Sequence, residues 1–286
     1  MKFKTIFAKM TACSLILTAL FGCGQASQTA DGAQDTQSAQ TTELTVFAAA
    51  SMTETLNQIA EDYKKVDPNV SLTFNFASSG DLLTQIKEGA VCDLFISAAP
   101  KQMNAMDGAL AQDAEKNPEG LDMLAEGSRM DLLQNKVTLA VPEGNPKGME
   151  NFDQLADLIR SGDVLLAVGN SDVPVGQYSQ KIFAYYGLNQ AQMDAAGVLT
   201  YGSNVKEVTT AVSEGTVDCG IIYATDAYSA GLTAVDAATS DMCGQVIYPA
   251  AVLKDSQNQE KALALLDYLN GDEATAIFES VGFSKP

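Results

Sequence analysis

The chain of 286 residues is long enough to bury a large core and to form two domains. It carries 36 acidic and 17 basic side chains, and the resulting net charge of −19 disfavours binding to nucleic acid. The chain has no histidine, which excludes Ser-His-Asp and Cys-His catalysis and every histidine metal ligand. An anionic ligand is not excluded, because dipoles inside a cleft act at short range whatever the net charge.

The five cysteines have spacings that fit neither a zinc site nor a CxxC redox motif. Cys92 and Cys219 lie in apolar runs typical of strands, so we expect them to be small buried hydrophobic residues. Whether two of Cys92, Cys219 and Cys243 form a disulfide stays open.

The first 22 residues have the pattern of a signal peptide, with a basic start and an apolar run that is too short to span a membrane. They end in Leu20-Phe21-Gly22-Cys23, which resembles a bacterial lipobox and implies a lipid on Cys23. Residues 23–42 are rich in Gln, Ser, Thr and Ala and predict a flexible tether. The expected product is lipid-anchored to the outer face of the cell membrane. The alternative is an ordinary secretory signal with a chance cysteine.

The first globular stretch alternates short apolar runs with helical patterns. Leu44 to Ala50 predicts a buried strand that leads into a helix, and Ser51 with Glu54 fits a capping box. Residues 71–76 and 93–97 predict two further strands, with a helix between them that starts near Ser79. This order of strand and helix is typical of a parallel sheet with right-handed crossovers.

The rest of the chain repeats this alternation after an acidic, weakly patterned segment at 113–127. Proline and glycine punctuate the predicted elements. We expect strands at 136–141, 164–169, 198–201, 219–223 and 245–248, and helices at 152–160, from 173, from 203, at 259–269 and at 273–280.

These two groups of βα units predict an α/β protein of two domains with parallel-type sheets and a ligand cleft between them. We expect domain 1 to be discontinuous, with residues 43–131 and 227–286, because the final helices have no sheet of their own. Domain 2 is expected at 132–226.

Four predicted strand-to-helix turns share a small, neutral character. Ser51, Ser79, Val175 and Val205 each stand at an expected helix start, with no Lys, Arg or acidic residue at the position itself. A helix start offers free N–H groups and a partial positive charge of roughly half a unit. Several such starts around one cleft would hold an oxyanion without a cationic side chain.

Several motifs occur in one order along the chain and together resemble the molybdate-binding proteins of ABC importers, from about Leu44 to Phe283. These motifs are Phe47-Ala48-Ala49-Ala50-Ser51, Phe76-Ala77-Ser78-Ser79, Asp93-Leu94-Phe95-Ile96-Ser97-Ala98, Asp172-Val173-Pro174-Val175-Gly176, Gly220-Ile221-Ile222-Tyr223, Tyr248-Pro249 and Val281-Gly282-Phe283. The resemblance implies the two-domain periplasmic-binding-protein fold of type II.

The resemblance also implies the ligand set. Ser51 and Ser79 would bind molybdate through hydroxyl and amide, Val175 and Val205 through their amides, and Tyr223 through its hydroxyl. Molybdenum would be bound only as this oxyanion, and tungstate should bind comparably. The resemblance further implies a monomer without cofactor or catalysis, which hands its ligand to an ABC permease and its ATPase.

Two other functions stay open at this point. The first is a binder of another oxyanion such as sulfate or phosphate. The second is an acyl enzyme, because Ser203-Asn204-Val205-Lys206 matches the Ser-x-x-Lys of penicillin-recognising enzymes, although the chain has no Lys-Thr-Gly partner motif. Tyr223 has its own alternative, since tyrosines in strands often serve packing alone.

Overall fold

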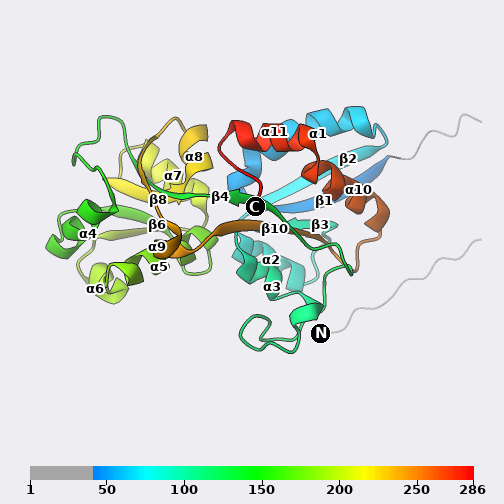
Figure 1. The fold of residues 1–286 in the computed structure, drawn as a ribbon, viewed down its shortest axis with the longest axis horizontal. Coiled ribbons are helices and arrows are strands. Elements are labelled where there is room, and N and C mark those ends of the chain that lie inside the picture. The colour runs from blue at the N-terminus through cyan, green and yellow to red at the C-terminus, as the bar shows by residue number, and fades with distance from the viewer. Residues whose placement is uncertain (1–40) are drawn as a thin grey trace, which may run out of the picture. The chain divides into compact units, whose positions relative to one another are not determined.

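The computed structural model describes residues 41–286, and the expected signal peptide at 1–22, the lipidation at Cys23 and almost all of the tether at 23–42 lie outside them. Within residues 41–286 the strands form two five-stranded sheets, each covered by helices (Figure 1). This is the expected α/β architecture.

The first sheet has the strand order β2-β1-β3-β10-β4. β1 runs parallel to β2 and β3, whereas β10 runs antiparallel to β3 and β4. The strands of this sheet are β1 (Thr42–Ala49), β2 (Val70–Ala77), β3 (Leu94–Ile96), β4 (Met130–Asn135) and β10 (Val246–Val252). The helices that follow or precede them in the chain are α1 (Thr53–Val66), α2 (Ser79–Lys87), α3 (Pro100–Asn104), α10 (Gln259–Asn270) and α11 (Asp272–Ser280).

The second sheet has the strand order β7-β6-β8-β5-β9. β6 runs parallel to β7 and β8, and β5 runs antiparallel to β8 and β9. Its strands are β5 (Val137–Val141), β6 (Leu166–Gly169), β7 (Leu199–Gly202), β8 (Cys219–Tyr223) and β9 (Thr233–Ala237). The helices of this part are α4 (Phe152–Ser161), α5 (Pro174–Tyr185), α6 (Gln190–Ala195), α7 (Val205–Ser213), α8 (Ala224–Ser229) and α9 (Ser240–Cys243).

Local chemistry explains where the helices begin and end. α4 starts after Asn151, whose side chain accepts the Gln154 N–H at 2.9 Å, and it ends at Gly162, which takes a left-handed conformation with φ 73°. α7 starts after Asn204, whose side chain accepts the Glu207 N–H at 3.1 Å. β5, β6 and β8 are buried over their whole length, as expected for strands covered on both faces.

The chain passes between the two sheets at two places. β4 leads directly into β5 through Lys136, and β9 leads into β10 through α9 (Figure 1). The sheets are therefore mixed, because the strands β4, β5, β9 and β10 around these passages pair antiparallel. Periodicity did not predict β4 or β9. The domain boundaries stay a prediction, and sheet membership places β4 with the first sheet and β9 with the second.

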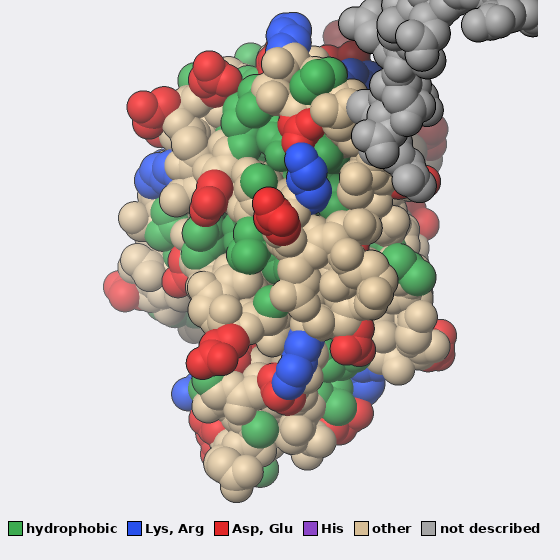
Figure 2. Space-filling model, turned by 90° about the vertical axis from the view of Figure 1, so that its right-hand side faces the viewer, with side chains coloured by type: hydrophobic (Ala, Val, Ile, Leu, Met, Phe, Trp, Pro, Cys, Tyr) green, Lys and Arg blue, Asp and Glu red, His purple; other side chains and the backbone are tan. Residues whose placement is uncertain are grey.

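Charges on the surface are mixed rather than segregated. Figure 2 shows acidic side chains scattered over one face, with fewer basic side chains among them. On α1, Lys64 pairs with Glu61 and Lys65 with Asp62, and all four side chains are exposed. Such exposed pairs contribute little to stability. None of the helices in residues 41–286 has the length and apolarity that crossing a bilayer requires.

Cysteines in the described part of the chain are buried thiols. Cys92, Cys219 and Cys243 are all free, so the question of a disulfide among them is answered. Burial raises the pKa of the Cys92 and Cys219 thiols to about 12. The expectation that Cys92 and Cys219 are small buried hydrophobic residues is confirmed.

Candidate functional site

All five residues that the sequence singled out line one small pocket between the two sheets. Its volume is about 10 Å³, roughly the space that a single water molecule needs. The first sheet contributes residues at or just after the ends of β1, β2 and β3, and the second contributes residues at or just after the ends of β6, β7 and β8. The lining residues are Ala49, Ala50, Ser51, Ala77, Ser78, Ser79, Ala98, Val173, Pro174, Val175, Val205 and Tyr223.

Ser51 does not form the predicted capping box. It lies in a 3₁₀ turn at Ala50–Met52, one residue before the N-cap of α1, and its hydroxyl lies 2.9 Å from the hydroxyl of Tyr248. Glu54 turns away from the helix start and pairs with Lys206. The local pattern correctly predicted that a helix begins here. It was wrong in predicting that the Ser51 hydroxyl caps this helix, because the hydroxyl forms a hydrogen bond with Tyr248 instead.

Ser79 is the first residue of α2, and Ser78 before it is the N-cap, with its hydroxyl accepting the Asp81 N–H at 3.1 Å. The Ser79 hydroxyl accepts the N–H of Ala98 at 3.0 Å. Since its oxygen already accepts a hydrogen bond from the backbone, its own proton is left to donate. Ser79 is fully buried, so this proton points into protein or pocket rather than solvent.

Val175 and Val205 bring backbone amides rather than side-chain groups. The first intrahelical hydrogen bond of α5 is made by the Gln177 N–H to Val173, and that of α7 by the Val208 N–H to Asn204. The amides of Val175 and Val205 precede these bonds and therefore have no acceptor within their helices. Each also lies at the positive end of a helix dipole.

Tyr223 ends β8, is 1% exposed, and its hydroxyl has no hydrogen-bond partner among residues 41–286. Its ring meets Tyr178 and Tyr248 edge-on, with centroids 6.4 and 5.7 Å apart. Burial, reinforced by the neighbouring tyrosines and Asp226, raises the pKa of Tyr223 well above its usual value. The hydroxyl thus stays protonated, and a buried donor without an acceptor is rare enough to require an explanation.

No lining residue of the pocket carries a charge. Lys206 follows Val205, but its Nζ lies 2.8 Å from Glu54 and 3.1 Å from the buried carboxylate of Asp226. Burial raises the pKa of Asp226 to about 6, against the opposing effect of Lys206. One cation therefore pairs with two acids, so any anion that the pocket binds would have to be held by neutral donors.

The Ser-x-x-Lys motif does not form a catalytic pair. The Ser203 hydroxyl donates to Glu207 at 2.7 Å, while the Nζ of Lys206 pairs with Glu54 and Asp226. The serine therefore has a carboxylate beside it and not the lysine that the motif would pair with it. Within residues 41–286 there is also no cluster of three Cys, Asp or Glu side chains that could hold a metal ion.

The glycine at position 80 brings the two sheets together beside the pocket. A Cβ built on Gly80 would lie 2.5 Å from the carbonyl oxygen of Asp172, which belongs to the turn before α5. The Gln102 side chain reaches the same oxygen at 3.5 Å. Glycine therefore permits an approach of the two halves that any other residue would obstruct.

Gly176 plays a similar part inside the second half, where an added Cβ would lie 2.1 Å from the Asn170 oxygen. The helix α5 can thus start directly against the end of β6.

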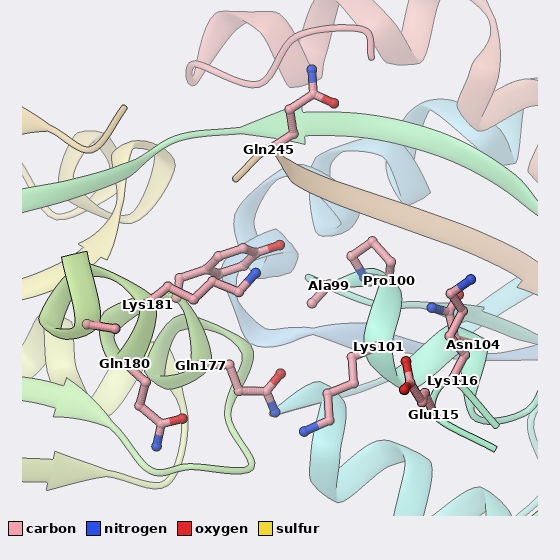
Figure 3. Close-up of a pocket in the computed structure, with 12 residues that line it drawn as sticks. Ala99, Pro100, Lys101, Asn104, Glu115, Lys116, Gln177, Gln180, Lys181 and Gln245 are labelled. Carbon is pink, nitrogen blue, oxygen red and sulfur yellow. The ribbon is translucent and has the colours of Figure 1, made fainter. Parts of the chain in front are cut away.

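A second, larger groove runs between α3 and α5 (Figure 3). It has a volume of about 590 Å³ and contains Lys101, Lys116 and Lys181. The Lys181 Nζ donates to the carbonyl of Cys243 at 3.2 Å, and Lys116 pairs with Asp113 at 3.2 Å. Its cations are exposed, and two of them have partners, so this groove lacks the unsatisfied buried donors of the small pocket.

Three features around the pocket were not predicted from the sequence. Tyr248 was noted only as part of a motif, Asn135 was not singled out, and the approach of Gly80 to Asp172 was not foreseen. All three act through contacts between distant segments, for which a local pattern carries no signal.

These features define the class. Two open α/β sheets, joined by two chain passages and with helix starts converging on one pocket, are the architecture of periplasmic binding proteins. The family described as bacterial extracellular solute-binding protein matches residues 44–284, and the chain belongs to this family.

Relatives cover nearly the same length. YvgL of Bacillus subtilis, a provisionally assigned substrate-binding lipoprotein of an ABC transporter, is 30% identical over 99% of this chain and 98% of its own. The molybdate-binding protein ModA of Haemophilus influenzae is 31% identical over 86% of this chain and 91% of its own. The periplasmic molybdate-binding protein of Azotobacter vinelandii shares the fold with a TM-score of 0.70 at 19% identity, over 85% of this chain and 99% of that chain.

Proposed function

We propose that this protein captures molybdate, and tungstate comparably, outside the cell and delivers it to an ABC permease driven by its ATPase. The proposed donors are the hydroxyls and amides of Ser51 and Ser79, the amides of Val175 and Val205, and the hydroxyl of Tyr223. The protein needs no cofactor and performs no catalysis in this role. Closure of the two halves around the ion would be the signal that the permease reads.

The observation that carries the proposal is the Tyr223 hydroxyl, a fully buried donor without a partner in a pocket that holds no charged side chain. A hydrogen bond to an ionised acceptor would satisfy it and would be stronger than one to a neutral group. The relatives named for molybdate binding support the choice of oxyanion. A sulfate ion is a smaller tetrahedron, so donors fixed for molybdate would reach it poorly.

Calorimetric titration with molybdate, tungstate, sulfate and phosphate tests this function. We expect tight binding of the first two and weak or no binding of the others. Tight binding of sulfate or phosphate would replace the proposed ligand, and absence of heat with every oxyanion would remove the function.

A pair of tyrosines supplies the matched variants. Tyr223→Phe removes the proposed donor and should weaken molybdate binding by about 1–3 kcal/mol, or roughly five- to 150-fold. Tyr178→Phe removes a hydroxyl from an equally buried ring in contact with the first and should leave the affinity unchanged. Equal losses in both variants would mean that Tyr223 serves packing alone.

We also propose that Cys23 carries the lipid that retains the protein at the membrane as a monomer. The lipoprotein named among the relatives supports this. Labelled fatty acid should enter the wild-type protein but not Cys23→Ala, which should leave the cells. Retention of the variant at the membrane would contradict the proposal.

A further inference from the structure

We propose that the ion pair between Lys206 and Glu54 is a latch across the two halves of the molecule, which slows the release of a bound oxyanion. The inference rests on the proposed function, because it gives residues outside the pocket a part in retaining the ligand. Neither side chain lines the pocket, so both are positioning residues. Glu54 lies three residues after Ser51 and Lys206 directly follows Val205, so the pair is close in sequence to proposed donors of both halves.

The pair joins helices that belong to opposite halves. Glu54 lies in the first turn of α1, beside the first sheet, and Lys206 is the second residue of α7, beside the second sheet (Figure 1). The Lys206 Nζ donates to both carboxylate oxygens of Glu54, at 2.9 and 2.8 Å. A movement that separates the two halves at these helices therefore has to break the pair.

Asp226 keeps Lys206 with the second half. Its carboxylate is fully buried on α8, and the Lys206 Nζ lies 3.1 Å from Oδ1. This contact is an ion pair without the alignment of a hydrogen bond, so neither oxygen of Asp226 has a hydrogen-bond partner within residues 41–286. A buried carboxylate that lost its cation would be left uncompensated, which is costly. Lys206 therefore stays with Asp226 when the halves separate, and the contact with Glu54 is lost.

This arrangement favours the pair over an ordinary ion pair of the surface. The Lys206 side chain is 30% exposed, against 56% for Lys64, which pairs with Glu61 within α1. Exposed pairs gain little, partly because two long side chains must be ordered to form them. Asp226 already orders Lys206, so only the Glu54 side chain has to be ordered when the halves close. Burial disfavours the charge of Lys206, but Asp226 and Glu54 outweigh it and raise its pKa, so the ammonium persists.

The contact between α3 and the turn before α5 is weaker. The Gln102 side chain reaches the carbonyl oxygen of Asp172 at 3.5 Å, which is long for a hydrogen bond between uncharged groups. The groove of about 590 Å³ between α3 and α5 also leaves this side of the molecule open (Figure 3). The charged pair between α1 and α7 should therefore contribute more to holding the halves together.

Glu54→Gln tests the latch against a matched control. The variant removes one charge from a half-exposed side chain and leaves Lys206 with Asp226. Glu61→Gln removes the same charge from the same helix but breaks only a pair within α1. Radiolabelled molybdate is chased with excess tungstate at one fixed pH. We expect Glu54→Gln to release molybdate about two- to fivefold faster than Glu61→Gln, with association no slower.

Charge reversal and salt sharpen the test. Glu54→Lys replaces attraction by repulsion and should release molybdate faster still, whereas Glu61→Lys, with the same change in net charge, should not. High salt should bring the release rates of Glu54→Gln and Glu61→Gln together, because a partly exposed pair is screened.

Three results would overturn the latch. The first is an equal release rate in Glu54→Gln and Glu61→Gln. The second is slower release from Glu54→Gln, which would follow if Glu54 did no more than repel the anion. The third is a loss of affinity due to slower association, which would mean that Glu54 shapes the pocket and does not hold it shut.

Failure of the latch and failure of the proposed function are distinguishable. If another oxyanion binds in place of molybdate, the same release rates are measured with that anion. If no oxyanion binds, the proposed function fails, and small-angle scattering of the ligand-free protein decides on the latch: a larger radius of gyration in Glu54→Lys than in Glu61→Lys supports it, and equal radii overturn it. If molybdate binds and leaves Glu54→Gln and Glu61→Gln at the same rate, only the latch fails.

Discussion

The small pocket and the groove between α3 and α5 differ in volume and in charge, and these two properties alone would favour the groove as an anion site. The groove is the larger by far and contains lysines, which an anion would seem to require. The pocket is small and uncharged, yet it holds a buried hydroxyl without a partner and helix amides without acceptors. In the proposed role, anion recognition would depend on donors that folding leaves unsatisfied, and exposed cations with partners of their own would contribute little.

The largest expected effect comes from Asp226, a buried acid beside the pocket. Its pKa of about 6 lies above the ordinary 3.8, so the folded state binds the proton more tightly than the unfolded state. The stability due to this group is fully present below pH 3.8 and is lost as the pH rises through 6, by about 3 kcal/mol. Asp226→Asn should remove this loss.

Denaturant unfolding of both proteins from pH 4 to pH 7 measures the effect. The stability of the variant relative to the wild type should increase as the pH rises from 4 to about 6 and should then stay constant to pH 7. A constant difference between the two proteins would show that Asp226 is not the buried acid described here.

Gly80→Ala tests whether the pocket depends on the close approach of the two halves. The added methyl would meet the Asp172 carbonyl, and such overpacking should weaken molybdate binding by about 1–3 kcal/mol. Alanine's better helix propensity, worth about 1 kcal/mol, opposes this clash, so the free energy of unfolding without ligand should fall by no more than about 2 kcal/mol. Titration and denaturation of the same variant separate the two effects, and an unchanged affinity would place closure elsewhere.

Ser79→Ala should have the next largest effect on affinity, about 1–2 kcal/mol, because it removes one proposed donor and leaves the Ala98 N–H unpartnered. Calorimetry should find the same loss at low and at high salt, because the hydrogen bond from Ser79 would be buried and therefore little screened. A loss that disappears with salt would indicate an indirect electrostatic effect.

Lysine substitutions in the groove should have the smallest effect. Lys101→Ala and Lys181→Ala are expected to change the molybdate affinity less than about twofold, because both side chains are exposed and screened. Lys181→Ala should lower stability slightly, since its ammonium lies 5.0 Å from the Tyr178 ring centroid. A large loss of affinity in either variant would move the anion site toward the groove.

The sequence predicted those parts of the fold that depend on neighbouring residues. Buried runs such as Cys219–Tyr223 stand out because parallel strands are apolar on both faces, and Asn204 and Gly162 mark helix ends through backbone chemistry. The same signals placed Ser79 and Val205 at helix starts.

What the sequence did not predict depends on distant partners. Ser51 looked like a cap until Tyr248, 197 residues away, took its hydroxyl. The partly exposed strand β9 has no apolar run, and its pairing with β5 makes it a strand. The chemistry of single residues suggests candidate site residues. Only the tertiary structure shows which of their polar groups have no hydrogen-bond partner.

The three buried thiols have a consequence for life outside the cell. A fold without a cross-link among Cys92, Cys219 and Cys243 does not need oxidative folding machinery to bring these residues together after export. Oxidants attack the thiolate rather than the thiol, and burial keeps Cys92 and Cys219 protonated. The described domain should therefore tolerate both reducing and oxidising surroundings with its architecture unchanged.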